Sequence, residues 1–242
     1  MQNISNMTIR DIAVAEPATT RVFEEFKIDY CCGGGKLFAD ACSAVGVAPQ
    51  VVSEKIDAVL GRNSSDEVPE RKGTSELIQY IIDKHHVFTR NEIVRLAALA
   101  DKVASKHGGN HPELNEVREA FSILGNDLIS HMAKEEMMLF PYIERLDIAK
   151  RKELPIPFAP FGTVNNPIRM MCTEHDEAGN ILKRLRSLTA DYTVPDDACP
   201  SFRALYFGLN DLELDLHQHI HLENNVLFPR AVELEKHGLN GH

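Results

Sequence analysis

Basic residues are scarce in this sequence, which has 26 Lys and Arg against 36 Asp and Glu and a formal charge of −10. A chain with this charge is not expected to bind nucleic acid or an anionic membrane surface. No apolar run approaches the roughly 18 residues that span a membrane, and the first residues lack the basic and apolar regions of an export signal. We therefore expect a cytoplasmic protein.

Disulfide-forming patterns are also absent. The five cysteines are an odd number, and Cys31 and Cys32 are adjacent, which is not the spacing of a disulfide framework. We expect reduced thiols, with Cys42, Cys172 and Cys199 packed as small apolar side chains.

One polar segment, residues 61–73, has the Gly- and Pro-bounded composition of a linker. It predicts a small helical domain at 1–62 and a larger domain at 74–242. In the first, short helices are expected between residues 7 and 60, because Thr8 to Asp11 resembles a capping box and residues 49–60 form a helical pattern that ends at a glycine.

The larger domain has little strand-like alternation and four long stretches of helix-forming residues. They cover roughly residues 74–106, 112–147, 165–190 and 199–236, and Gly- or Pro-rich breaks separate them. Four helices of this length with modest loops predict an all-α, up-down-up-down four-helix bundle.

An internal repeat gives the strongest indication of function. His131 is followed by Glu135 and then by Leu-Phe-Pro141, and His219 is followed at the same spacing by Glu223 and Leu-Phe-Pro229. A single histidine precedes each copy, His86 by 45 residues and His175 by 44. Internal repetition of this kind is more specific than one motif match. We expect the two prolines to terminate or bend their helices.

All six residues of the repeat lie on apolar stripes with helical spacing, so they are expected to face the core. An ionised glutamate there is costly unless it is paired or bound to a metal. The alternative for a single copy is an exposed ion pair between residues four apart. The remaining histidines are expected to face solvent or to lie in loops, and these are His85, His107, His111, His217, His221, His237 and His242.

Four imidazoles and two carboxylates can hold two transition-metal ions, with the carboxylates as bridges. Structural zinc sites are four-coordinate, and oxygen-bound calcium or magnesium does not need imidazoles. Two irons therefore fit best, with two manganese ions or a mixed pair as the alternatives. Ferritin-like sites contain more carboxylates. Of Cys42, Cys172 and Cys199, only Cys172, three residues before His175, is expected to lie near this centre.

The thiols of Cys31 and Cys32 precede Gly33-Gly34-Gly35 and an expected helix, where backbone N–H groups can favour a thiolate. This placement suits a redox, nitrosyl-accepting or metal-passing role. The alternative is two small side chains packed beside a turn. A disulfide between adjacent cysteines would be strained, so a stable bridge is not expected.

Together, the stretch from Asp29 to Gly34, the segment from His175 to Gly179 and the segment from Leu222 to Pro229 resemble the repair of iron centres (RIC) family, the YtfE/ScdA/DnrN type of hemerythrin-like di-iron protein. The resemblance covers nearly the whole chain. It implies a hemerythrin-like bundle, two non-haem irons with oxo and carboxylate bridges, and a route to the metals lined by Asp127 and Glu174. The implied iron ligands are His86, His131, Glu135, His175, His219 and Glu223.

The resemblance also implies repair of iron-sulfur proteins damaged by nitric oxide or oxygen species, by a monomer or homodimer. Cys31 and Cys32 would assist as thiols, and iron donation or nitric oxide reduction would be the activity. A hemerythrin-like protein that binds or senses oxygen or nitric oxide is the alternative. Gly179, where oxygen-carrying hemerythrins have a further histidine, argues against it.

Overall fold

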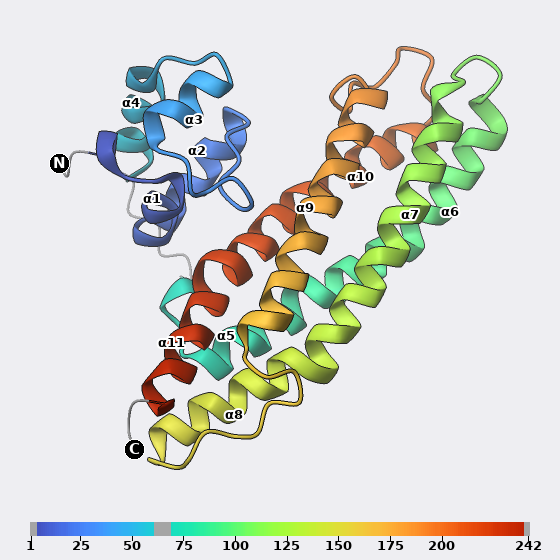
Figure 1. Ribbon diagram of the computed structural model, residues 1–242. Coiled ribbons are helices and arrows are strands. Elements are labelled where there is room, and N and C mark those ends of the chain that lie inside the picture. The colour runs from blue at the N-terminus through green and yellow to red at the C-terminus, as the bar shows by residue number, and fades with distance from the viewer. Residues whose placement is uncertain (1–3, 61–68, 240–242) are drawn as a thin grey trace.

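The computed structural model describes residues 4–60 and 69–239, and within these ranges the chain is helical without a strand (Figure 1). The N-terminal part contains η1 (Ile4–Asn6), α1 (Ile9–Ala15), η2 (Pro17–Thr19), α2 (Thr20–Glu25), α3 (Phe38–Ala44) and α4 (Pro49–Leu60). The capping box at the start of α1 is present, since Thr8 Oγ1 accepts from the Asp11 N–H and the Asp11 carboxylate accepts from the Thr8 N–H.

These short helices enclose a core of their own. Its largest side chains include Ile9, Phe23, Tyr30 and Phe38, and none of these is exposed by more than 2%. The expected linker lies at the end of α4, and its residues 61–68 fall outside the described part of the chain. Its last residues, η3 (Pro69–Arg71), lie against the bundle, where Arg230 donates to the main-chain oxygens of Glu70 and Lys72.

Four long helical segments form the bundle, as predicted. They are α5 (Thr74–Tyr80), η4 (Ile81–His86) and α6 (Val87–His107); α7 (Glu113–Lys134), η5 (Glu135–Leu139) and α8 (Phe140–Arg151); α9 (Asn165–Leu188); and α10 (Pro200–Leu222), η6 (Glu223–Leu227) and α11 (Phe228–Leu239). The loops between consecutive segments lie at alternate ends, which gives up-down-up-down topology (Figure 1). In the described residues, no helix has a stretch apolar enough to span a membrane.

Three of the four segments contain a π-helical turn, and each turn includes a residue of the repeat: His86 in η4, Glu135 in η5 and Glu223 in η6. The helices do not end at Pro141 and Pro229, so of the two expected effects, termination or a bend, the structure excludes termination. The residue before each proline donates its N–H across five residues, Phe140 to the Glu135 oxygen and Phe228 to the Glu223 oxygen. The π turn thus continues the helix past a proline that has no N–H to donate.

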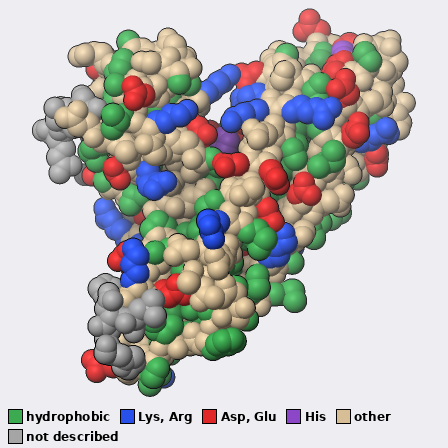
Figure 2. All heavy atoms as spheres, viewed as in Figure 1, with side chains coloured by type: hydrophobic (Ala, Val, Ile, Leu, Met, Phe, Trp, Pro, Cys, Tyr) green, Lys and Arg blue, Asp and Glu red, His purple; other side chains and the backbone are tan. Residues whose placement is uncertain are grey.

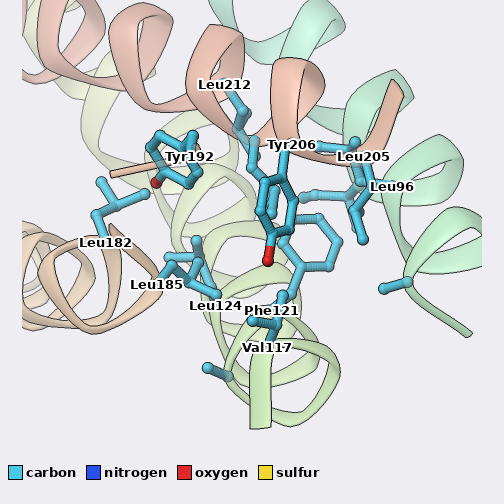
Figure 3. Close-up of a cluster of buried hydrophobic side chains, with 14 of the residues drawn as sticks. Leu96, Val117, Phe121, Leu124, Leu182, Leu185, Tyr192, Leu205, Tyr206 and Leu212 are labelled. Atoms are coloured by element: carbon cyan, nitrogen blue, oxygen red, sulfur yellow. The ribbon is translucent and has the colours of Figure 1, made fainter. Parts of the chain in front are cut away.

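Two apolar clusters fill the bundle, one toward each end. The first contains Leu96, Phe121, Leu205 and Leu212, whose side chains point toward one another from α6, α7 and α10 (Figure 3). The second surrounds Phe140, Met171 and Phe228 at the other end. Along each helix the residues of the repeat lie between the two clusters, so the polar site is enclosed by apolar packing on both sides.

The N-terminal helices pack beside η6 and α10. Asn225 Nδ2 donates to the main-chain oxygen of Tyr30 at 3.0 Å, His217 Nδ1 lies 2.9 Å from Glu24, and Gln218 donates to Thr20. Beside these contacts, a cavity of about 540 Å³ separates the Cys31–Cys32 loop from α9 and α10. Figure 2 shows this hollow between the two parts, with acidic and basic side chains around it.

Candidate metal centre

All six residues of the repeat converge in the middle of the bundle. They form two groups of four that share both glutamates, and in each group one ligand atom per residue lies within 4.8 Å of every other. The first group, here called position A, contains His86 and His219. The second, position B, contains His131 and His175. The six side chains come from η4, α7, η5, α9, α10 and η6.

Each carboxylate spans both positions. Glu135 Oε2 lies 3.4 Å from His86 Nε2, and its Oε1 lies 3.4 Å from His131 Nε2. Glu223 Oε1 lies 2.9 Å from His219 Nε2, and its Oε2 lies 3.1 Å from His175 Nε2. Both carboxyl groups are fully buried. Each position therefore has two imidazole nitrogens and one oxygen from each glutamate.

Three of the four imidazoles are fixed from behind through Nδ1. His86 Nδ1 lies 2.6 Å from Glu136, the residue after Glu135, and His175 Nδ1 lies 3.0 Å from Asn224, the residue after Glu223. His131 Nδ1 lies 2.9 Å from Glu174. When such a ring is neutral and Nδ1 donates to these oxygens, Nε2 is unprotonated and faces the centre of the bundle as a ligand.

The Leu-Phe-Pro repeat contributes ring contacts. Phe140 stacks on His86 with ring centroids 5.7 Å apart, and Phe228 stacks on His175 at 6.2 Å. In each half of the repeat, the phenylalanine thus covers the single histidine of the same half. These contacts limit rotation of the two imidazoles and exclude water from one of their faces.

Burial and the facing charges act in opposite directions on the pKa values of the residues at this site. Burial lowers the pKa of His86, but the carboxylates of Glu135 and Glu223 outweigh it and raise the pKa to about 10. The same competition raises the pKa of His131 to about 9, whereas burial lowers the pKa of His219. Burial acts to raise the pKa of Glu223, but the facing histidines hold it well below its usual range.

A network of ion pairs is the alternative to a metal centre, with His86 and His131 protonated against the two carboxylates. In that network His86 donates to His219 Nε2 at 3.1 Å and His131 to His175 Nε2 at 3.0 Å. It leaves both oxygens of the buried Glu135 without a hydrogen bond. Two nitrogens bound at right angles to one cation, at bonds of about 2.1 Å, would be about 3.0 Å apart. The donor set and its unsatisfied oxygens therefore fit two cations better than protons.

Two histidines expected to face solvent are buried instead. His85 is 1% exposed, stacks on His219 and pairs with Asp215, and His221 is 1% exposed and accepts from Asn225. His217 is partly buried against Glu24. These predictions were wrong for His85 and His221, because His219 of α10 packs against His85, and Tyr30, between α2 and α3, packs against His221. His107 and His111 are partly exposed, and His237 and His242 lie outside the residues with described side chains.

All five cysteines are free. The Cys31 and Cys32 sulfurs are 3.9 Å apart, and the N–H groups of Cys32 and Gly33 donate to the Asp29 carboxylate. The hydrogen bond with Cys32, together with burial, raises the pKa of Cys31 well above its ordinary value. The expectation that backbone N–H groups favour a thiolate was therefore wrong for Cys31.

The other three cysteines lie in different surroundings. Cys42 is packed in the N-terminal core, as expected. Cys172 lies near the centre, since its sulfur contacts the Asn224 side chain that also accepts from His175. Cys199 lies at the N-terminus of α10, 3.2 Å from His107 Nε2.

A cavity of about 110 Å³ reaches the centre from the surface between α7 and α9. Asp127 and Glu174 both line it, together with Lys134. Glu174 also accepts from His131 and pairs with Lys134. The structure thus places both expected route residues beside an opening to the site. Glu136 and Asn224 were missed, although each directly follows a glutamate of the repeat.

The bundle and its two His/Glu groups define a hemerythrin-like protein with a cation-binding centre. Residues 77–231 match the hemerythrin HHE cation binding domain, and residues 5–60 match ScdA_N, a domain of unknown function (DUF542). The chain is 32% identical over 230 residues to the iron-sulfur cluster repair protein YtfE of Yersinia pseudotuberculosis. The matched region covers 95% of this chain and 98% of the relative. The YtfE protein of Yersinia pestis (strain Pestoides F) matches equally. The chain belongs to the YtfE family of hemerythrin-like proteins.

Proposed function

We propose that this protein holds two irons in the centre of its bundle and repairs iron-sulfur clusters damaged by nitrosative or oxidative stress. The observation that supports this most directly is the pair of buried carboxylates, each with one oxygen directed to position A and one to position B. The relatives' name, iron-sulfur cluster repair protein, gives the process. A pair of irons supplies exchangeable ferrous ions and one-electron redox chemistry.

The chain's own residues would define how these irons are held and reached. His86 and His219 would bind one iron, His131 and His175 the other, and both glutamates would bridge. Glu136, Glu174 and Asn224 would orient three of the imidazoles through Nδ1. The opening lined by Asp127 and Lys134 would admit a small ligand or release an ion.

The N-terminal domain would contribute the thiols. Cys32 is partly exposed at the 540 Å³ cavity, whereas Cys31 is buried and remains a thiol. Cys32 is therefore the better placed of the two to meet a client protein. We propose residues 1–62 and 74–242 as the domain limits, with clients approaching at this cavity.

A hemerythrin-like carrier or sensor of oxygen or nitric oxide is the second candidate. Within the described residues, each four-residue group contains two imidazoles, and no further histidine belongs to either group. A Cβ built on Gly179 would meet no atom within 4 Å, and this position faces the cavity beside the Cys31–Cys32 loop. That arrangement favours repair over a carrier with an additional histidine ligand. Stable, reversible oxygen binding by the reduced protein would favour the carrier.

The test is restoration of an iron-sulfur hydratase that nitric oxide has inactivated. Protein loaded with isotopically labelled iron should restore hydratase activity and transfer the label to the client. Glu223→Ala should fail, because a carboxylate bridging both positions is lost, and its iron content should fall below about one per chain. Glu119→Ala is the matched control, an exposed glutamate on α7, and should retain iron and repair.

The outcomes separate the mechanisms. Labelled iron in the restored cluster indicates donation, and restoration without label indicates nitric oxide processing. Purified protein without iron would overturn the proposal. Cys31→Ser with Cys32→Ser should keep the irons but lose repair, since serine supplies no thiolate near neutral pH. Full repair by that variant would leave the bundle as the active part.

A further inference from the structure

The hydrogen-bond partners of Nδ1 follow the same pattern in the two halves of the repeat, with an exception at one of the four imidazoles. Each single histidine, His86 or His175, donates from Nδ1 to the residue after a glutamate of the repeat. His131 donates to Glu174, the residue before His175. By the same relationship, the partner of His219 should be the residue before His86. That residue is His85.

His85 does not act as an acceptor for His219. The two rings are stacked, with centroids 5.5 Å apart and planes 9° from parallel. His85 Nδ1 lies 3.0 Å from Asp215, and its Nε2 is buried without a hydrogen-bond partner in the described residues. His219 Nδ1 is likewise buried without a protein partner there.

The two positions therefore differ by one hydrogen bond. Each has one imidazole supported by a carboxylate, His86 by Glu136 at position A and His131 by Glu174 at position B. The other imidazole of position B, His175, donates to Asn224. Its counterpart at position A, His219, has only the face of His85 behind it.

We propose that position A, formed by His86, His219 and one oxygen of each glutamate, holds its metal ion more weakly than position B, and that His85 is the residue responsible. An acceptor at Nδ1 fixes the ring and makes Nε2 a stronger ligand, and removing one lowers metal affinity about tenfold to a hundredfold. The ion at position A is then released first. This inference rests on the proposed function, where it assigns the exchangeable iron to one of the two positions.

The first test starts from the full-length protein loaded with ferrous iron. An excess of a ferrous chelator is added, and the absorbance of the iron–chelator complex measures the rate of iron release. Two phases of equal amplitude are expected, about tenfold or more apart in rate. His85→Glu places a carboxylate where the repeat has Glu174 and should slow the fast phase alone. Glu174→Gln should accelerate the slow phase alone.

His85→Glu also brings a second carboxylate close to Asp215. His85→Gln serves as the neutral variant, because it offers an amide oxygen to His219 as Asn224 does to His175. A second measurement needs no variant. In crystals of the iron-loaded protein exposed briefly to the chelator, anomalous scattering should persist between His131 and His175 and weaken between His86 and His219. A single release phase, persistence at His86 and His219, or equal effects of His85→Gln on both phases would overturn the inference. Absence of bound iron would instead overturn the proposed function.

Discussion

Asn225 donates its side-chain amide to the main-chain oxygen of Tyr30 at 3.0 Å, across the boundary between the N-terminal helices and the bundle. Asn225 is buried and lies in the π turn η6 that begins at Glu223. Three consecutive residues thus face three different groups: Glu223 the centre, Asn224 the ring of His175, and Asn225 the main chain leading into Cys31. One turn of helix connects the candidate metal centre with the cysteine loop.

Replacement of Asn225 should loosen this loop. In Asn225→Ala the Tyr30 oxygen loses a buried donor, at a cost of about 1–3 kcal/mol. Cys31 should therefore become more accessible, and its alkylation should accelerate severalfold while iron content stays unchanged. Mass spectrometry of each cysteine measures this. Lys27→Ala is the control, because its contact with Asp191 also joins the two parts but is exposed and contributes about 1 kcal/mol at most. An unchanged rate in Asn225→Ala would show that other contacts hold the loop.

The start of α9 should depend on a buried carboxylate. Glu235 accepts from Tyr142 Oη at 2.8 Å and from the Val164 N–H at 2.9 Å. Tyr142→Phe removes one of these bonds and should lower stability by about 1 kcal/mol, or roughly 2–4 °C in Tm. Glu235→Ala leaves both donors buried and should cost more. Thermal unfolding of the apoprotein measures both, and Tyr206→Phe, whose hydroxyl has no partner in the described residues, should change Tm least.

The four helical segments could be predicted because their apolar residues recur every three or four positions, and Gly- and Pro-rich breaks separate them. The convergence of His131, Glu135, His219 and Glu223 followed from the same periodicity, since each lies on an apolar stripe. Neighbouring helices bury such a stripe wherever the bundle forms. Local pattern and tertiary packing therefore agreed for these residues.

The parts that could not be predicted depend on departures from regular periodicity or on contacts between distant segments. Glu136 and Asn224 lie in π turns, which a regular helical period does not predict, and they contact imidazoles of other helical segments. His221 is buried because Tyr30, from the other end of the chain, packs against it. The burial of His85 against His219 likewise requires knowing how two helices pack together.

The phenylalanines of the repeat should support both stability and the imidazoles. Phe228→Ala leaves a cavity beside His175 and should cost about 3–5 kcal/mol, or roughly 6–20 °C in Tm. Phe228→Leu should recover most of this loss because it refills the space, but it lacks the flat face that restrains the ring. Faster iron release from Phe228→Leu at nearly normal Tm would show that the stacking of Phe228 on His175 helps to hold the iron. Normal release would indicate that Phe228 acts by packing alone.

Cys199 should be more reactive than the buried cysteines, contrary to the expectation that it only packs. Backbone N–H groups of Phe202 and Ser201 at the start of α10, with Lys106 and Lys102 nearby, lower the pKa of the Cys199 thiol. Burial raises the pKa of Cys42. A lower pKa gives a larger thiolate fraction at any pH below it, and the thiolate is the nucleophile. Alkylation of Cys199 should therefore persist toward lower pH than that of Cys42, across a titration from about pH 6 to pH 9.

Per-residue mass spectrometry gives the pH profile of alkylation for each cysteine. Lys102→Gln and Lys106→Gln together should shift the Cys199 profile to higher pH and leave the Cys42 profile in place. Coincident profiles in the unaltered protein would contradict the assignment, because the local field at the start of α10 would then be too weak to distinguish Cys199 from a buried thiol.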